Sequence, residues 1–447
     1  MRAHADIQGN ILRGYASHLH AAYLLAGIGD DPGQVRALLA RLVDEDQIAT
    51  ERDWGDAPAT RLNVALTRPG LQRLGVNMTP FAPYSEFWEG MFERARARLG
   101  DLGDNDPSKW DEPLTQGADL LFTVYGLTPE RRTAAAERVE AALQRAGMRV
   151  VHRQDADMLE DGREHFGFAD GFSQPALRGK SEDRRARHGE GVQRGRLRLT
   201  GEEWRNVELG EFVLGHRDED GVVPGGREPL LVNGTFMVWR KLQQHVEVFQ
   251  DWIRRHAGDD AYAQRALQAK ILGRWPNGDS LVREPESAPA GARSHDRQIN
   301  DFTYSGDPGG VRCPLGAHVR RANPRDALGF RTERTRRNRI IRRGLPYVDR
   351  DETRGLIFVC FNASIARQFE QVQGNWLMGG DTFGLGAECD FLTAGLDPGQ
   401  PRVRMTIQGD RAHPPSFIWR DEAFVTVRGG YYLFVPGLRA LRRIAGR

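Results

Sequence analysis

A strand-then-helix pattern recurs along the 447-residue chain and restricts its fold more than any other feature of the sequence. Residues 20–28 are an apolar, strand-like run, and residues 31–45 follow with the periodicity of an amphipathic helix. Residues 119–127 and 128–147 repeat this pair. Because an amphipathic helix must bury its apolar stripe, the pattern indicates helices packed on sheets.

Two further segments complete this unit, and the second half of the chain follows the same plan. Residues 61–75 have the pattern of a strand and a short helix, and residues 148–159 that of a closing strand, so the order is close to β-α-β-β-α-β. In the second half the corresponding patterns lie at residues 233–242, 243–258, 355–364, 365–376 and 429–437. We predict an α+β protein of two ferredoxin-like domains with antiparallel sheets, residues 1–225 and 226–447.

Two long stretches lack this periodicity. Residues 178–204 are rich in Gly and charge, which predicts a surface insertion or linker. Residues 273–314 are also irregular but contain Trp275, Phe302 and Tyr304. Because aromatic side chains favour burial, we expect this second stretch to be an ordered loop that covers a pocket.

Composition excludes several classes of partner. The 63 Lys and Arg residues nearly balance the 61 Asp and Glu residues, so a formal charge of +2 gives no reason to expect nucleic acid or a membrane surface. The three cysteines, Cys313, Cys360 and Cys389, are too few for a disulfide framework and suit a reducing compartment. There is no apolar run of membrane-spanning length and no export signal at the N-terminus. We expect a cytoplasmic protein that can form a homo-oligomer.

The segment CPLGAHVRRANPR, residues 313–325, contains a candidate iron ligand. A neutral imidazole such as that of His318 binds iron well, and the nearby guanidinium groups of residues 320, 321 and 325 suit carboxylates such as haem propionates. Asn323 could accept the proton of the other ring nitrogen. Cys313 is a rival ligand, and a lone histidine is more often a structural residue, so the segment alone leaves the ligand open.

An arginine-rich segment, residues 330–347, allows two interpretations. Its seven arginines could form a nucleic-acid patch, but the near-zero net charge and the lack of a binding motif favour a solvated, salt-bridged loop. Within it, the apolar neighbours in IIRRGLP would carry Arg342 or Arg343 inward. An arginine held in this way usually meets a buried anion or a developing negative charge.

The segment EHFGFADGFSQP, residues 164–175, places Asp170 among three phenylalanines and between Gly167 and Gly171. An Asp before a Gly is an ordinary turn signal. The alternative is that Asp170 is a proton-transfer group in a partly apolar pocket. The chain has no zinc-type Cys/His spacing, no phosphate-binding Gly-rich loop and no G-x-S-x-G motif, which weakens hydrolase and nucleotide interpretations.

Taken together, these motifs resemble those of the dye-decolourising peroxidases, a family of haem enzymes. The resemblance spans nearly the whole chain. It includes the family's G-x-x-D-G signature as Gly167 to Gly171, and it is carried in the family's order by DIQGNILRGY, FGFADGFSQP, GRWPNG, CPLGAHVRRANPR, IIRRGLPY and GLIFVCFNASIARQFEQVQ. The larger, often cytoplasmic, subgroups of the family have a similar length and similar insertions.

The resemblance implies a fold, a cofactor and a set of site residues. It implies two ferredoxin-like domains with b-type haem between them, mainly on the C-terminal half. His318 resembles the proximal iron ligand, Asp170 the distal acid and Arg342 the distal arginine. Weaker correspondences are Arg320 as a propionate contact, Asn323 as a partner of the proximal histidine, Leu356 and Phe358 as residues lining the distal face, and Gly167 and Gly171 as positions where the backbone passes close to the haem.

The activity implied is peroxidase chemistry on hydrogen peroxide with small aromatic reductants such as dyes and phenols. Asp170 would move a proton between the two peroxide oxygens, and Arg342 would stabilise negative charge on the departing one. Electrons could enter through aromatic side chains, for which the candidates by residue type are Trp376, Trp419, Tyr431 and Tyr432. The alternatives are a haem-handling or haem-sensing protein with incidental peroxidase activity, and a fold that has lost haem and serves as a binding module.

Overall fold

The computed structural model describes residues 5–447 except 16, 53–57, 178–205, 287–298, 301, 329–334, 398 and 400. The linker predicted at residues 178–204 lies outside the described residues. In the other irregular stretch, Trp275, Phe302 and Tyr304 are all buried in one apolar cluster, so the described part of this loop is ordered. No helix of the described residues is both long and apolar enough to cross a membrane.

The first half forms the predicted ferredoxin-like unit. Its elements are β1 (His20–Gly27), α2 (Pro32–Asp44), β2 (Thr60–Leu66), β3 (Leu120–Gly126), α7 (Pro129–Arg145) and β4 (Arg149–Asp157). The strands lie in the order β4-β1-β3-β2, and all neighbours are antiparallel. Side chains cap both long helices: Asp31 accepts the N–H of Gly33 before α2, and Thr128 accepts the N–H of Arg131 before α7.

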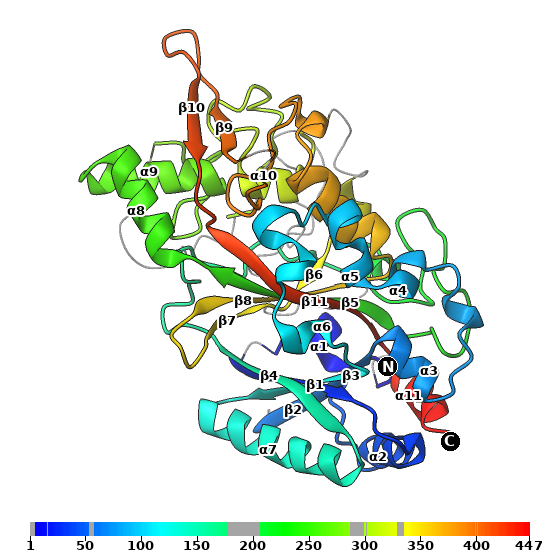
Figure 1. Cartoon of the computed structure of the whole chain (residues 1–447). Helices are drawn as coiled ribbons and strands as arrows, with labels where there is room; N and C mark the ends of the chain where they lie inside the picture. The colour runs from blue at the N-terminus through cyan, green and yellow to red at the C-terminus, as the bar shows by residue number, and fades with distance from the viewer. Residues whose placement is uncertain are drawn as a thin grey trace.

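Short helices fill the connection between β2 and β3 and the start of the chain. These are α1 (Gly9–Leu12), α3 (Arg68–Arg73), η1 (Thr79–Phe81), α4 (Ser85–Glu89), α5 (Met91–Arg94), η2 (Ala95–Leu99), η3 (Gly103–Asn105), η4 (Pro107–Lys109) and α6 (Glu112–Thr115). In Figure 1, α4 and α5 lie beside the sheet of the second half rather than beside β1 to β4. The connection between two strands of the first half therefore helps to cover the second.

The second half repeats the topology with added segments. Its strands are β5 (Thr235–Gln244), β6 (Ile341–Arg342), β7 (Leu345–Val348), β8 (Arg354–Asn362) and β11 (Val425–Val435), in the order β11-β5-β8, with β6 and β7 both paired to β8. Its other elements are η6 (Leu209–Glu211), α8 (Val246–Ala257), α9 (Ala261–Leu272), α10 (His318–Ala322), η7 (Thr335–Asn338), η8 (Ala366–Leu377), η9 (Asp381–Phe383), β9 (Val403–Ile407), β10 (Ser416–Arg420) and α11 (Leu438–Ile444). The predicted α+β class and the antiparallel sheets are confirmed.

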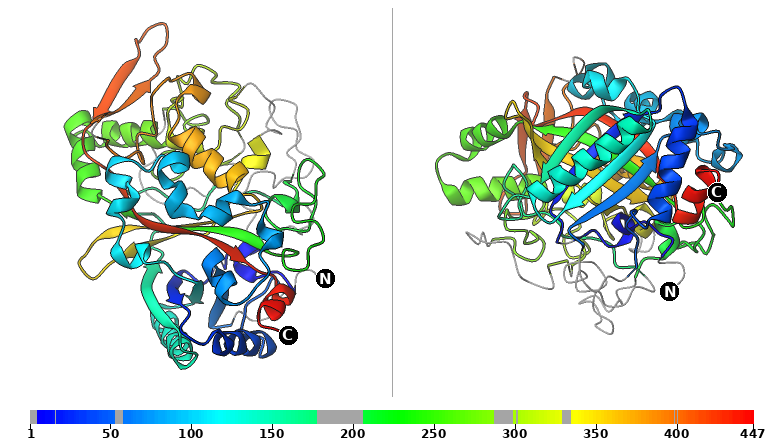
Figure 2. Two further views of the ribbon diagram at one scale, coloured as in Figure 1. Left: turned by 45° about the vertical axis from the view of Figure 1, so that its right-hand side comes forward. Right: turned by 90° about the horizontal axis from the view of Figure 1, so that it is seen from below.

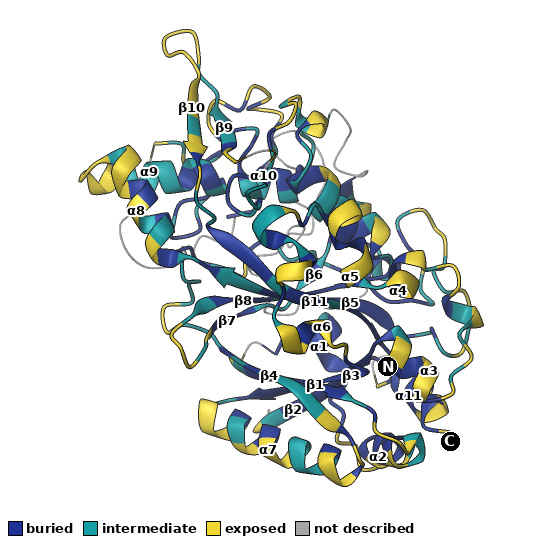
Figure 3. Cartoon of the chain, viewed as in Figure 1, coloured by how far each residue is buried: buried dark blue, intermediate teal, exposed yellow. Residues whose placement is uncertain are grey.

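The two sheets join edge to edge and also pack face to face. Leu66 of β2 pairs with Phe434 of β11, which links all nine strands. One face of each sheet contributes to a common buried cluster that includes Tyr23 and Trp239, whose ring centroids are 6.1 Å apart. Figure 2 shows α2 and α7 against the outer face of the first sheet, and Figure 3 shows that most strand residues are buried. The division into residues 1–225 and 226–447 stays a prediction.

Candidate functional site

The structure brings Asp170 and Arg342 together from segments that lie far apart in the sequence. Arg342 ends β6, and its Nη1 is 3.8 Å from Oδ1 of Asp170. Each of these two side chains is 38% exposed. Nη2 of Arg342 also donates to the carbonyl of Phe172, at 2.9 Å. An acid and a guanidinium therefore face the same partly open space.

The loop that carries Asp170 owes its shape to glycines and to buried aromatic rings. Gly167 and Gly171 have φ values of +95° and +87°, in the left-handed region that favours glycine. Phe166 and Phe168 are buried, and their ring centroids lie 4.6 and 6.4 Å from that of Phe249 on α8. The phenylalanines therefore anchor the loop in the core, and Asp170 stays at its open edge.

The neighbouring arginine, Arg343, points elsewhere. Its Nε donates to the carbonyl of Asn10 and its Nη2 to that of Ile11, both at 3.1 Å. Because successive strand residues face opposite sides of a sheet, only one of the two arginines can reach Asp170. The geometry favours Arg342, as the resemblance implied.

His318, the candidate iron ligand, is the first residue of α10. Its Nδ1 lies 3.1 Å from Oδ2 of Asp390, whose side chain is fully buried. Asp390 is fixed in turn, because its Oδ1 accepts the N–H of Leu392 and both the N–H and the hydroxyl of Thr393. With Nδ1 engaged, the imidazole presents Nε2 for coordination.

The electrostatics of this pair suit a metal-binding imidazole. Burial raises the pKa of Asp390, but the charge that His318 carries when it is protonated, its hydrogen bond, the hydroxyl of Thr393 and the charge of Arg321 outweigh burial and lower it to about 2. An ionised carboxylate hydrogen-bonded to a histidine makes the other ring nitrogen a better ligand. Sequence reasoning missed Asp390, since it lies 72 residues from His318 and no local motif marks it.

Two of the weaker correspondences receive other roles in the structure. The acceptor for Nδ1 of His318 is Asp390, which takes the place that the sequence assigned to Asn323. Arg320 is fully buried and donates to Asp307 and to the carbonyl of Cys313, and its guanidinium lies 4.4 Å from the ring centroid of Tyr304. Nη1 and Nη2 of Arg320 are therefore engaged by partners within the protein. Its role as a propionate contact stays a prediction.

The rival ligand Cys313 does not have the properties of a metal-binding thiolate. It is completely buried, and burial raises the pKa of its thiol to about 12. A protonated thiol is a poor ligand. All three cysteines, Cys313, Cys360 and Cys389, are free.

The outer face of the second sheet supplies an apolar surface next to Arg342. Arg342 lies opposite Cys360 on β8, so Phe358 and Leu356, two and four residues earlier, share its face. Both are only partly buried, although β8 is an interior strand, whereas Ile357 on the opposite face is fully buried. Incompletely covered apolar side chains beside a charged pair, with an imidazole on a nearby helix, fit a flat apolar macrocycle with a central metal. The site residues lie on this outer face and not in the packed layer between the two sheets.

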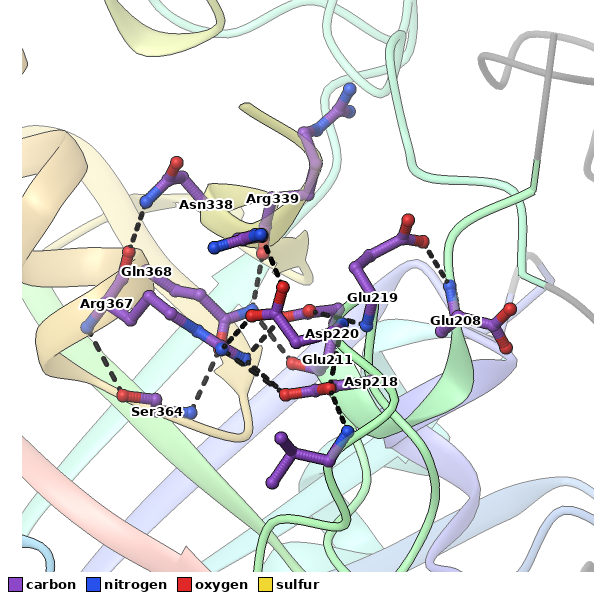
Figure 4. Close-up of polar contacts among 12 residues, drawn as sticks. Glu208, Glu211, Asp218, Glu219, Asp220, Asn338, Arg339, Ser364, Arg367 and Gln368 are labelled. Carbon is purple, nitrogen blue, oxygen red and sulfur yellow. Dashed lines mark hydrogen bonds and ion pairs between the residues drawn. The ribbon is translucent and has the colours of Figure 1, made fainter. Parts of the chain in front are cut away.

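A buried network of charged and amide groups holds the segment that leads to Arg342 (Figure 4). Gln368 donates to the carbonyls of Arg339 and Glu211, at 2.6 and 2.8 Å. Arg367 pairs with Glu211 at 2.8 Å. The guanidinium of Arg339 donates to the carbonyl of Ser173 at 2.7 Å. Segment η8 contacts α10 as well as β8 and η7, so one element touches both the histidine side and the arginine side of the site.

The four candidate electron-transfer aromatics differ in exposure. Trp419 on β10 is 46% exposed, and its ring is 5.7 Å from the guanidinium of Arg404. Trp376 and Tyr432 are buried, and Tyr431 is partly buried, with its hydroxyl bonded to the carbonyl of Leu114. Trp419 is therefore the most exposed member of this set.

The chain resembles known proteins along nearly its whole length. The family model described as Dyp-type peroxidase, C-terminal, matches residues 214–382. The dye-decolorizing peroxidase msp1 of Mycetinis scorodonius is 28% identical over 483 residues, which cover 98% of this chain and 87% of that protein. The multifunctional dye peroxidase DyP2 of Amycolatopsis sp. is 29% identical over 414 residues, which cover 86% of this chain and 82% of that protein.

A solved structure supports the same assignment at the level of the fold. The complex of a dye-decolorizing peroxidase with 2,6-dimethoxyphenol has a TM-score of 0.81 to this chain, covers 99% of both chains and is 24% identical in sequence. The matched region of the family model contains Arg342, His318 and all of β8. The family model, the curated relatives and the solved structure all support the dye-decolourising peroxidase family, which the sequence motifs resemble.

Proposed function

We propose that the chain is a haem-dependent peroxidase that reduces hydrogen peroxide and oxidises small aromatic compounds such as dyes and phenols. The observation that carries the proposal is the distal pair, Asp170 and Arg342, whose charged atoms are 3.8 Å apart at the edge of a partly exposed apolar face. The names of the curated relatives and the phenol complex of a structural neighbour support the same substrate classes. The cofactor is b-type haem, held by His318.

Different residues of the chain would transfer the proton, stabilise the developing charge and orient the iron ligand. Bound haem supplies an iron centre that accepts peroxide and delivers its oxidising power to organic substrates. Asp170 takes a proton from one peroxide oxygen and returns it to the other, which requires the carboxylate form at the start. Arg342 stabilises the negative charge that develops on the departing oxygen. Asp390 keeps the imidazole of His318 in one tautomer and orientation.

We further propose a cytoplasmic location, small aromatic reductants as partners and no nucleic acid or membrane partner. The near-balance of charges supports the absence of a nucleic-acid surface, and the three free cysteines suit a reducing compartment. The larger subgroup of the family and a homo-oligomeric assembly belong to the same proposal.

Two measurements test the function. Reconstitution of the purified protein with haem should give a Soret band, and the loaded protein should bleach a dye only when peroxide is added. Replacement of the proximal ligand, His318→Ala, should abolish axial coordination or haem retention. A chain without a Soret band is not a haem protein of either kind. Haem binding without peroxide-dependent oxidation would instead support the haem-handling alternative.

A further inference from the structure

A second carboxylate, Glu164, lies partly buried inside the loop that carries Asp170, and the proposed mechanism gives it no role. Its Oε1 accepts the N–H of Phe168 at 2.9 Å, and its Oε2 accepts the N–H of Phe166 at 3.0 Å. The side-chain amide of Gln244 donates to the same Oε2. Three donors therefore converge on one carboxylate, and this geometry is that of an ionised acceptor.

These bonds connect the loop to β5, a strand held by hydrogen bonds to a neighbour on each side. Gln244 is the last residue of β5, which pairs with both β8 and β11. The loop is also closed by backbone bonds: the N–H of Glu164 donates to the carbonyl of Phe168 at 2.9 Å, and the N–H of Asp170 donates to that of Gly162 at 3.4 Å. The carboxylate of Glu164 is thus a side-chain link between the Asp170 loop and β5 of the second sheet.

The charge on Glu164 is sensitive to its surroundings. Burial raises the pKa of Glu164 to about 7, although the N–H groups of Phe166 and Phe168 and the Gln244 amide act in the opposite direction. The negative charge of Asp170 adds to the increase. These four groups, from the loop and from β5, are the polar and charged groups that act on Glu164 among the described residues. None of these four groups is a cation.

We propose that Glu164 is a positioning residue for Asp170, holding the loop so that the distal acid faces Arg342. This inference rests on the proposed function of Asp170. The bonded N–H groups belong to Phe166 and Phe168, four and two residues before Asp170, so a shift at either amide is passed directly to the acid. A distal acid displaced by about 1 Å is expected to lose much of its effect on proton transfer.

The test uses the haem-loaded full chain and an equilibrium readout. Hydrogen cyanide must lose its proton to bind as an anion, so the cyanide affinity, followed by the shift of the Soret band, reports the position of the distal acceptor. In Glu164→Gln an NH₂ group replaces one acceptor oxygen and opposes a bonded donor. We expect the cyanide dissociation constant to rise about tenfold and kcat/KM for peroxide to fall by at least as much. The KM for the reducing dye should stay unchanged.

Three further variants separate positioning from general destabilisation. Gln244→Met removes one donor to Glu164 while keeping a side chain of similar size. It should weaken cyanide binding by a smaller factor than Glu164→Gln. This variant tests the positioning role even if Glu164→Gln does not fold. Asp119→Asn is the matched control: Asp119 is a buried carboxylate of the first half that accepts the N–H of Ile28 at 2.7 Å. It should lower the melting temperature and leave cyanide affinity at the wild-type value.

The remaining variant, Asp170→Asn, should weaken cyanide binding more than either Glu164→Gln or Gln244→Met. If Asp170→Asn weakens cyanide binding but Glu164→Gln and Gln244→Met bind cyanide like the wild type, the positioning role of Glu164 is wrong and the proposed function stands. If Asp170→Asn also has no effect, the assignment of Asp170 as the distal acid fails, and the positioning role fails with it.

Discussion

The two halves of the molecule share one strand order but cover the outer faces of their sheets differently. In the first half, α2 and α7 pack on this face, and Phe122, on the third strand of the unit, is completely buried. In the second half, Phe358 occupies the third strand of the repeated unit, β8, and stays partly exposed. The pair formed by Asp170 and Arg342 lies at the edge of this second face.

This difference in covering arises because the helix that follows the first strand packs in a different place in each unit. In the first half α2 follows β1 and returns to the sheet, whereas in the second half α8 follows β5 and enters a separate apolar cluster with Phe166, Phe168 and Trp275. The cluster stabilises the Asp170 loop, and the sheet face that α8 does not cover becomes available. One topology thus yields a closed core in one half and a binding surface in the other.

The largest effect should follow from removing the distal pair, which lies at the outer face of the second sheet. Asp170→Ala removes the proton acceptor and Arg342→Leu removes the positive charge, and we expect each to lower kcat/KM for peroxide by about 10²- to 10⁴-fold. Stopped-flow kinetics of the first step with peroxide measure the change. Arg343→Leu is the control, because Arg343 faces α1 and not Asp170. Wild-type rates in both distal variants would refute their catalytic assignment.

A matched pair of core variants tests whether the two faces differ in function. Phe122→Ala should cost about 3–5 kcal/mol of unfolding free energy, since it opens a cavity in a closed core. It should leave the haem dissociation rate unchanged. Phe358→Ala should cost less stability in the haem-free protein and should speed haem loss. Chemical denaturation and haem transfer to an acceptor protein measure the two quantities. Equal haem loss in both variants would contradict the contrast between the faces.

The fold could be predicted largely from the sequence because it depends on local periodicity. The run at residues 20–28 corresponds to β1 at His20–Gly27, and residues 128–147 contain α7 at Pro129–Arg145, which Thr128 caps. The short helix predicted within residues 61–75 corresponds to α3 at Arg68–Arg73, but the hairpin β9–β10 and the short helices between α3 and β3 were not predicted. These elements are brief, and tertiary contacts rather than propensity determine them.

The site was predictable only where a motif marks it. Asp170 and Arg342 stand in motifs that the resemblance identified, and the structure places them side by side. Asp390 carries no motif, and its role depends on a contact with His318 that only the folded chain creates. The internal partners of Arg320 could not be predicted from its nearness in sequence to His318, because side chains two residues apart on a helix point to different sides.

The proximal pair offers a smaller test of the second half. In Asp390→Asn a neutral amide replaces the ionised carboxylate that holds Nδ1 of His318. We expect haem affinity or peroxide activity to fall by about 10- to 100-fold, as for other residues that orient a metal ligand. The haem dissociation rate and the ferric absorption spectrum measure the effect. Thr393→Val, which removes one donor to Asp390, should change both in the same direction by less. Unchanged spectra in both variants would contradict the proposed orientation of His318.

The smallest effect is the contribution of Glu211, in the network beside the second sheet, to the pH dependence of stability. Burial raises the pKa of Glu211 from 4.5 to about 7, despite the nearby charge of Arg367. Because the folded state holds this proton more tightly than the unfolded state, the contribution to stability is fully present below pH 4.5 and is lost as the pH rises through 7. Glu211→Gln cannot titrate. From pH 5 to pH 8 the wild type should therefore lose on the order of 1–3 kcal/mol relative to this variant.

Urea unfolding at several pH values measures the difference. The control is Glu45→Gln, at an exposed carboxylate of the first half, and it should follow the wild type. If the wild type instead gains stability relative to Glu211→Gln over this range, the ion pair of Glu211 with Arg367 outweighs the effect of burial. The charged groups of the second half would then be compensated as fully as the apolar groups of the first half are buried.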